Sequence, residues 1–474
     1  MGIATMICGG CGAEAPIDDP FRCRNAREGD DIDHVLSRVL DDENVAFPGE
    51  QSDANPFIQY RELTLAWQLG REHGLSNEEL LGLTRELSER VADVDNRRFT
   101  RTPLARIAGI EEAWELDSEL WAKDETNNVS GSHKARHLMG VMLYLQIAER
   151  LSVIPADRPL AISSCGNAAL AAAVIAKAGA KPIEVFVPTW ADPEIVDRLE
   201  TLGARLHRCV RPPESRGDPC TAAFRGAVGQ GAIPFSCQGS DNGLAIEGGM
   251  TLGYEMVAAM ARNPPDRIFV QIGGGALASA CIQAWREAKA WGIVSRIPRI
   301  HAVQTENTAP LDRAYQRVVA RISADLPGAS ANGAHIPADL RSIAERARTL
   351  RGHADSRAVA RTLRHAATHR SEYMWPWEAA PESIAHGILD DETYDWLAVV
   401  RGMIATGGYP ITVSEELLEE ARRTVRSATD ILADATGCAG LAGVARLRRA
   451  GLLEADERSV VLLTGVDRQV EDRR

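Results

Sequence analysis

The sequence lacks the features of a membrane-spanning, secreted or nucleic-acid-binding protein. No apolar run reaches the roughly 18 to 20 residues that cross a bilayer, and residues 1–12 contain no positively charged segment followed by an apolar one. Basic residues are outnumbered, with 53 Lys and Arg against 66 Asp and Glu. The formal net charge is −13, whereas binding to nucleic acid or to an anionic membrane needs a basic surface. We therefore expect a cytoplasmic protein whose partners include neither nucleic acid nor a membrane.

The sequence is also poor in cysteine and in aromatic residues. Its nine cysteines among 474 residues are an odd and scattered set, which does not suggest a disulfide framework and fits a reducing compartment. Aromatic residues make up only 5% of the chain, but apolar residues as a whole reach 45%, enough for packed cores. A chain of this length predicts two domains with extra segments.

Short β-rich runs alternate with helical patterns along most of the chain. The order of strand, loop and helix recurs along the chain, which predicts a parallel sheet covered by helices on both faces. The predicted fold class is therefore α/β. The runs lie at residues 120–123, 160–163, 183–187, 267–272, 300–303 and 460–463.

Two segments fall outside this alternation. Residues 1–60 are predicted to be an irregular N-terminal arm rather than a domain. Residues 310–410 combine an arginine-rich helical stretch with the aromatic run at residues 373–377, and we interpret them as a helical insertion. Its arginines are expected on a solvated helical face. The alternative is a lid that recognises an anionic substrate or partner.

Three turns between a strand and a helix carry the residue types of a cofactor site. Lys134 follows a small, polar loop at the edge where α/β sheets bind ligands, and a partly desolvated lysine amine is a good nucleophile. Glycines at residues 273–275 let backbone amides approach an anion. Residues 163–169 form another polar turn, suited to a carboxylate. Taken singly, these features also fit a solvated lysine, a tight turn and a helix cap.

Together and in this order, the segments resemble the fold type II family of pyridoxal-phosphate enzymes, and threonine synthase-like proteins most. The family also contains threonine and serine dehydratases, cysteine synthase and tryptophan synthase β. The resemblance covers residues 100–310 and 405–467. It rests on Thr102-Pro103-Leu104, Lys123-Asp124-Glu125, Ser132-His133-Lys134, Cys165-Gly166-Asn167, Glu247-Gly248-Gly249-Met250-Thr251, Gly273-Gly274-Gly275, the glycine-rich run 436–443 and Leu463-Thr464-Gly465.

The resemblance implies pyridoxal 5'-phosphate as the cofactor and a role for each matching residue. Lys134 corresponds to the lysine that carries the cofactor as a Schiff base and removes the Cα proton. Thr464 corresponds to a hydroxyl residue facing the pyridine nitrogen, which tempers the ring as an electron sink. The resemblance also implies that Asn167 bonds the phenolic oxygen, that Gly273, Gly274, Gly275 and Ala276 hold the phosphate with His133 beside them, and that Ser164, Cys165, Gly166 and Ala168 bind the substrate carboxylate.

The first cysteines resemble the zinc-ribbon-like start of some threonine synthases. Cys8 and Cys11 are followed by Cys23, but Ala26 stands where that pattern has a fourth cysteine. Because a structural zinc site normally has four protein ligands, no bound metal is expected. The alternative is that the three cysteines bind zinc together with a water or with His34.

The resemblance implies two three-layer αβα domains with mostly parallel sheets and the active site between them. We expect residues 61–132 and 247–474 to form the large domain and residues 133–246 the small one. The expected activity is Cα deprotonation of a small amino acid with β or γ elimination or replacement, in a homodimer. Ala135 and residues 466–468 depart from the family pattern, so a dehydratase, a cysteine synthase-like enzyme and a non-catalytic regulatory protein stay as alternatives.

Overall fold

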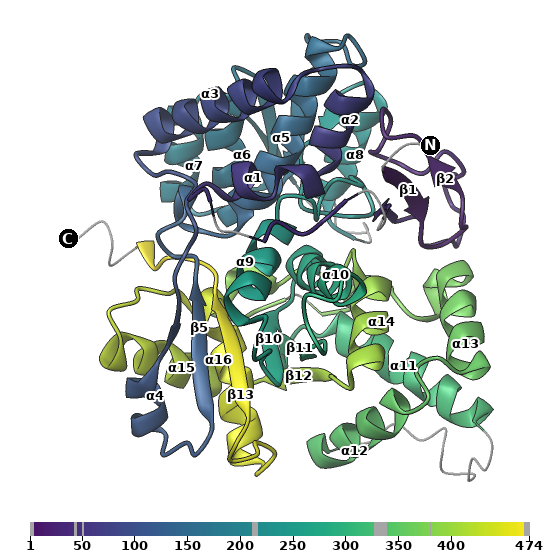
Figure 1. Ribbon diagram of the computed structural model, residues 1–474, viewed down its shortest axis with the longest axis vertical. Coiled ribbons are helices and arrows are strands. Elements are labelled where there is room, and N and C mark those ends of the chain that lie inside the picture. The colour runs from purple at the N-terminus through teal and green to yellow at the C-terminus, as the bar shows by residue number, and fades with distance from the viewer. Residues whose placement is uncertain are drawn as a thin grey trace.

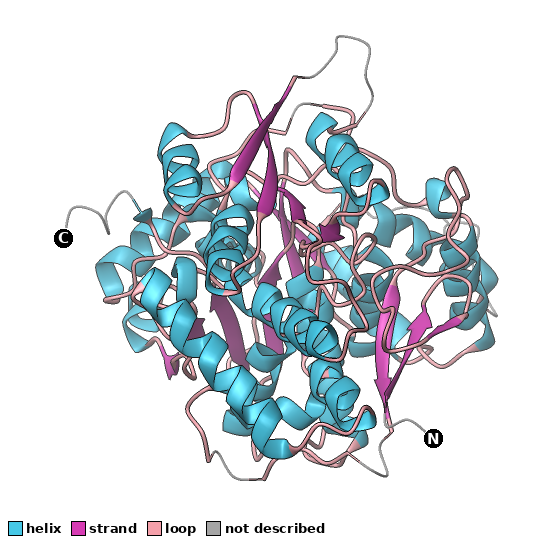
Figure 2. Cartoon of the chain, turned by 90° about the horizontal axis from the view of Figure 1, so that it is seen from above, coloured by secondary structure: helices cyan, strands magenta, loops and turns pink. Residues whose placement is uncertain are grey.

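The computed structural model describes residues 4–41, 45–49, 52–210, 217–326, 339–379 and 381–468. These residues form two bodies, each built around a sheet, and a small antiparallel sheet in the arm (Figure 1). Most strands of the two larger sheets lie in the interior among helices, and one strand reaches the upper edge of the view (Figure 2). The predicted α/β class is confirmed. Among the described residues, none of the helices combines the length and the apolarity needed to span a bilayer.

The larger sheet has the strand order β12-β11-β10-β13-β5-β4. Its described strands run parallel except for β4, which pairs antiparallel with β5. The parallel register sets Ile268 of β10 beside Ile300 of β11 and Val460 of β13. The strands are β4 (Leu104–Arg106), β5 (Glu119–Asp124), β10 (Arg267–Gln271), β11 (Arg299–Thr305), β12 (Pro410–Val413) and β13 (Arg458–Leu463).

Helices cover both faces of this sheet. On one face of the sheet, α16 packs against β10 and α15 packs on the outside of α16. On the other face, α10 and α14 pack against β11, and α9 packs on α10. The helices of this body are α4 (Ala108–Ala113), α9 (Met250–Met260), α10 (Ala276–Ala290), α11 (Pro310–Asp325), α12 (Leu340–Arg351), α13 (Arg357–Thr368), α14 (Trp396–Thr406), α15 (Glu415–Ala428) and α16 (Ala435–Arg449).

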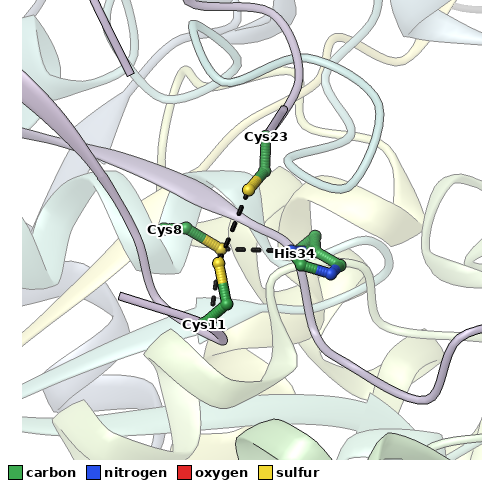
Figure 3. Close-up of side chains that lie close together, drawn as sticks. All are labelled: Cys8, Cys11, Cys23 and His34. Atoms are coloured by element: carbon green, nitrogen blue, oxygen red, sulfur yellow. Dashed lines mark hydrogen bonds between the residues drawn. The ribbon is translucent and has the colours of Figure 1, made fainter. Parts of the chain in front are cut away.

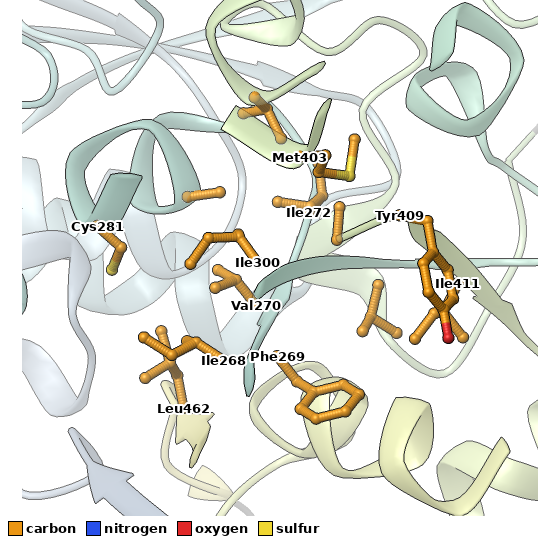
Figure 4. Packing of buried hydrophobic residues seen from close by; sticks show 14 of the residues in the cluster. Ile268, Phe269, Val270, Ile272, Cys281, Ile300, Met403, Tyr409, Ile411 and Leu462 are labelled. Atoms are coloured by element: carbon orange, nitrogen blue, oxygen red, sulfur yellow. The ribbon is translucent and has the colours of Figure 1, made fainter. Parts of the chain in front are cut away.

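Strand β10 lies at the centre of the larger core. All of its residues are buried, as expected for a strand covered on both faces. Ile268 and Val270 point to one face and Phe269 to the other, towards α16 (Figure 4). A Cβ on Gly443 of α16 would lie 2.7 Å from Val303 Cγ2. Glycine at this position therefore lets α16 lie close against the sheet.

The smaller sheet has the order β8-β7-β6-β9 and is parallel. Its strands are β6 (Leu160–Ser163), β7 (Ile183–Pro188), β8 (Arg205–Cys209) and β9 (Ile233–Pro234), and its helices are α5 (Lys134–Arg150), α6 (Asn167–Ala178), α7 (Pro193–Thr201) and α8 (Pro219–Gly229).

Two helices expected in the large domain lie beside the smaller sheet. α2 (Leu65–Glu72) packs on α5, and α3 (Asn77–Asp95) packs on α5 and α6. The apolar faces of both helices, including Leu69, Leu80 and Leu87, are fully buried in the same core as α5 and α6. Strands β4 and β5 do join the larger sheet. We therefore propose that the smaller unit includes residues 65–95 as well as residues 133–246.

The arm is more regular than the sequence suggests. It forms β1 (Ala4–Cys8), β2 (Glu14–Ala15) and β3 (Leu36–Leu40) in the order β2-β1-β3, followed by the short helix α1 (Pro56–Gln59). The alternating burial of β1 and β3 shows why these strands form, because one face of each is covered. The expectation of an irregular arm is therefore corrected.

The insertion forms α11 to α14, and most of its arginines point to solvent. Exposed arginines are Arg317, Arg321, Arg341, Arg348, Arg351, Arg357, Arg361, Arg364 and Arg401. In the aromatic run, Trp375 stacks under the guanidinium of Arg313, which lies 3.7 Å from the ring centre. Residues 388–395, just before α14, are instead drawn inwards, because they pack onto the glycine turn before α10.

Candidate active site

Lys134 is the first residue of α5 and follows the loop that leaves β5. The His133 N–H donates to the Thr464 carbonyl at 3.1 Å, which ties the end of this loop to the segment after β13. Gly131 has φ +67°, and a Cβ there would lie 2.5 Å from Val466 Cγ1. The turn into α5 therefore requires glycine. It leaves the Lys134 side chain partly exposed.

A buried network of charges lies beside this loop. Arg136 donates to Glu125 at 2.8 Å and to Glu255 at 2.8 Å, and Lys123 also pairs with Glu255. None of these four residues is more than 3% exposed. Burial alone raises the pKa of Glu255, but Arg136 and Lys123 hold that pKa below its ordinary value. Two cations and two carboxylates thus bind β5, α5 and α9 together.

Two neutral histidines flank Lys134. Burial and the charge of Lys134 place the pKa of His133 well below its ordinary value and lower the pKa of His137 to about 3. His137 Nδ1 lies 2.7 Å from the Ala245 carbonyl. Its Nε2 is a buried polar atom with no hydrogen-bond partner in the described part of the chain. Both imidazoles therefore stay uncharged in the neutral pH range, each with one ring N–H.

The three glycines join β10 to α10 in a tight turn. Gly275 has φ +92° at the N-cap of α10, a conformation that side chains other than glycine disfavour. A Cβ on Gly273 would lie 2.1 Å from Asp390 Oδ2. Glycine is therefore required on two grounds, the backbone conformation of Gly275 and the close approach of residues 388–395 to Gly273.

The carboxylate of Asp390 occupies this turn. Its Oδ2 lies against Gly273. Burial raises the pKa of Asp390 to about 6, although the charge of Lys134 and the Gly274 backbone N–H act in the opposite direction. The Asp395 N–H donates to the Gly274 carbonyl at 2.9 Å and fixes the segment. An anion thus already lies where a helix N-terminus favours one.

The charge of Lys134 also acts on a second carboxyl group and on a thiol. Burial raises the pKa of Asp395 to about 7, and its carboxylate accepts from the Gly239 N–H at 3.2 Å. Burial likewise raises the pKa of the Cys237 thiol, although the charge of Lys134 acts in the opposite direction. The surroundings of Lys134 therefore come from the loop before α9 and from the insertion as well as from the motifs.

The turn between β6 and α6 faces the same region. It is partly exposed from Ser164 to Ala168, and the Gly166 N–H donates to Ser164 Oγ at 3.4 Å. Burial and the charges of Asp218 and Asp390 raise the pKa of Cys165 to about 11. The charge of Asp390 therefore acts on the turn of the smaller sheet, on Lys134 and on the glycine turn.

Thr464 and Asn167 already make hydrogen bonds within the protein. The Thr464 hydroxyl accepts from the Gln271 side-chain amide, while Gln271 Oε1 is buried with no hydrogen-bond partner among the described residues. Asn167 Oδ1 accepts from Arg468 Nη2 at 2.7 Å. This bond orients the Asn167 amide group so that Nδ2 faces away from Arg468 and is available as a donor.

These residues fit pyridoxal phosphate. Lys134 offers a primary amine for its aldehyde, the glycine turn offers N–H groups for its phosphate, and Gln271 Oε1 is an orphaned polar atom nearby. Asp390 opposes the fit, because its carboxylate lies against the glycine turn where the phosphate would bind. The fold, the site and the family match given below together define a fold type II pyridoxal-phosphate enzyme.

The chain belongs to the family described as pyridoxal-phosphate dependent enzyme, whose model matches residues 96–372. It is therefore an enzyme of the lyase class with pyridoxal phosphate as its cofactor. The chain is 22% identical to the threonine synthase of Methanocaldococcus jannaschii over 367 residues, which are 77% of this chain and 74% of that protein.

Two further comparisons extend this likeness. The chain is 24% identical to the cysteate synthase of Methanospirillum hungatei over 372 residues, 77% of this chain and 74% of that protein. Among solved structures, the T.th. threonine deaminase superposes with a TM-score of 0.54 at 19% identity, covering 83% of this chain and 98% of that one. At this identity the structural likeness supports the fold alone.

Four residues near the site were not predicted from the sequence: Cys237, Asp390, Asp395 and Arg468. Asp390 lies more than 100 positions after the glycine turn, so no local spacing connects the two. The consecutive acidic residues 390–392 were a signal, because adjacent carboxylates in an apolar surrounding indicate a special environment.

The buried network leads to the first prediction. Glu255→Gln leaves Arg136 and Lys123 with one carboxylate fewer, so we expect the free energy of unfolding to fall by about 3 to 5 kcal/mol. Urea denaturation followed by far-ultraviolet circular dichroism measures this change. The exposed control Glu345→Gln should change it little. A Glu255→Gln protein as stable as the control would show that the network does not hold the loop.

The carboxylate on the glycine turn leads to the second prediction. At pH 8, Asp390→Asn should bind pyridoxal phosphate about tenfold more tightly than the wild type, since the competing anion is gone. Below pH 6 this gain should disappear, because Asp390, with its pKa of about 6, is then uncharged in the wild type. Absorbance titrations at both pH values measure the ratio, with Asp355→Asn as a control. An equal or weaker affinity of Asp390→Asn at pH 8 would contradict competition.

Proposed function

We propose that the protein removes the Cα proton of a small amino acid and eliminates or replaces its β or γ substituent, as a threonine synthase-like enzyme. The observation that supports this most is the meeting of three turns. Arg468 joins the loop before Lys134 to the turn at residues 164–168 through Ser130 and Asn167. The charge of Lys134 acts on Asp390, which lies against Gly273 of the glycine turn. A primary amine, an anion site and a carboxylate site in one place are what this chemistry needs.

The proposed roles follow from the proton affinities around Lys134. Pyridoxal phosphate, when bound, supplies the electron sink that makes the Cα proton removable. Lys134 Nζ is the proposed base, because His133 and His137 have pKa values too low to hold the proton near neutral pH. The N–H groups at the start of α6 orient the substrate carboxylate, and Thr464 bonds the cofactor's pyridine nitrogen.

Arg468 favours a substrate with an anionic side chain. Its guanidinium donates to Asn167 Oδ1 and to the Ser130 carbonyl, both at 2.7 Å, and therefore lies between the loop before Lys134 and the turn at the start of α6. A guanidinium is well suited to a phosphate or another oxyanion. This cation supports the threonine synthase-like activity over a dehydratase, whose hydroxyl leaving group is neutral.

The second candidate is a dehydratase or a β-replacement enzyme. It is favoured by the similarity to cysteate synthase and by Ala135, which departs from the family pattern next to Lys134. A regulatory protein that binds the cofactor without turnover is a more distant alternative. We also propose that the protein is a cytoplasmic homodimer, on the acidic composition and the family resemblance.

The third prediction tests the assignment of Lys134. Borohydride treatment of the cofactor-loaded protein should attach the reduced cofactor covalently to Lys134 Nζ. Peptide mass mapping locates the attachment, and Lys134→Ala should carry no adduct while keeping its far-ultraviolet spectrum. Lys177→Ala is a matched control, because this lysine is exposed at the end of α6. An adduct on another lysine of the wild type would overturn the assignment.

The fourth prediction separates the two candidate activities. Phosphohomoserine, threonine, serine, O-acetylserine and cysteine are each assayed for release of phosphate, ammonia and keto acid. We expect phosphohomoserine to release phosphate, and Arg468→Met to lower its kcat/KM at least about tenfold, the loss of one charged contact. Release of ammonia and keto acid from serine or threonine, with Arg468→Met unchanged, would instead support the dehydratase.

A further inference from the structure

Four side chains of the arm converge on one point: Cys8, Cys11, Cys23 and His34 (Figure 3). Their nearest ligand atoms all lie within 4.8 Å of one another. Cys11 Sγ is 3.6 Å from Cys23 Sγ, and Cys8 Sγ is 3.4 Å from His34 Nδ1. A tetrahedral zinc ion, with bonds of about 2.3 Å to sulfur and about 2.0 Å to nitrogen, separates its ligand atoms by roughly 3.5 to 3.8 Å. The observed separations fit this geometry.

The turn after β1 presents the first two cysteines. The Cys11 N–H donates to Cys8 Sγ at 3.5 Å, and Asn25 Nδ2 donates to Cys11 Sγ at 3.7 Å. Such donors stabilise the negative charge of thiolates. A Cβ on Gly10 would lie 2.4 Å from the Asp33 carbonyl oxygen. Glycine thus allows the turn to approach the loop that carries His34.

His34 is oriented by a carboxylate. Its Nε2 lies 3.2 Å from Asp30 Oδ2, while its Nδ1 faces Cys8. A proton on Nε2, shared with Asp30, leaves Nδ1 as a lone pair directed at the cysteines, and carboxylate partners of this kind commonly stand behind metal-binding histidines. The fourth ligand missing at Ala26 is therefore available from the loop before β3.

We propose that the arm binds one zinc ion through Cys8, Cys11, Cys23 and His34. The three thiols release their protons to solvent on binding, and the neutral imidazole completes a four-ligand structural site. The residue next to His34 docks the arm onto the insertion, since Trp396 Nε1 donates to Asp33 Oδ1 at 3.0 Å and the Asp33 N–H donates to the Ala367 carbonyl at 2.8 Å. Zinc thus stabilises the docking of the arm.

The fifth prediction concerns metal content and stability. Full-length protein purified under reducing conditions should contain about one zinc per chain by inductively coupled plasma mass spectrometry. Asp30→Asn should weaken zinc binding roughly 10- to 100-fold, and His34→Ala at least as much. Cys209→Ser and His353→Ala are matched controls outside the cluster. A chelator should lower the Tm of the wild type by several degrees and leave the Tm of His34→Ala unchanged.

Three results would overturn the proposal. The first is a reduced wild-type protein that takes up no equimolar zinc and gives no tetrahedral cobalt(II) spectrum. The second is unchanged zinc affinity in His34→Ala. The third is a disulfide between Cys11 and Cys23 that forms in air even when zinc is present. The zinc content and the cobalt(II) spectrum use the wild-type protein, so they decide the question even if a cysteine variant does not fold.

Discussion

The pairing of Arg136 with Glu125 and Glu255 determines where Lys134 lies. Because an unpaired charge at this depth is strongly destabilising, the end of β5, the start of α5 and the middle of α9 are held at fixed distances. Side chains two positions apart on a helix point in nearly opposite directions. Drawing Arg136 inwards therefore turns Lys134 away from the network, to the side where its charge acts on Asp390. The position of the amine thus depends on a network that is not itself part of the chemistry.

The glycine turn depends on a different balance. Its N–H groups at the start of α10 favour an anion, and Asp390 supplies one from within the chain. The insertion therefore contributes to the site through an acidic segment, not through the arginines that a lid for an anion would have used. Cofactor phosphate and Asp390 compete for the same place against the glycine turn. Because burial raises the pKa of Asp390, this carboxyl is protonated more readily than an exposed one. Cofactor binding should therefore depend on where residues 388–395 lie.

Local patterns predicted much of the fold. The apolar run of β10 and the glycines after it are short-range signals, and they correctly predict a buried strand and a turn. Contacts between distant segments were not predictable. The packing of α2 on α5 and the approach of Asp390 to Gly273 each join residues without a common sequence spacing. For the cysteine cluster, the sequence offered His34 only as an alternative to a water, and the structure brings His34 to the cysteines. The roles of Asn167 and Thr464 remain proposals that rest on the resemblance.

The most direct test of the central claim is a crystal structure of the cofactor-loaded protein. We expect the cofactor bonded to Lys134 Nζ, its phosphate hydrogen-bonded to the N–H groups of residues 273–276, and the Asp390 carboxylate displaced from Gly273. A phosphate bound elsewhere, with Asp390 still against Gly273, would contradict this assignment of the site.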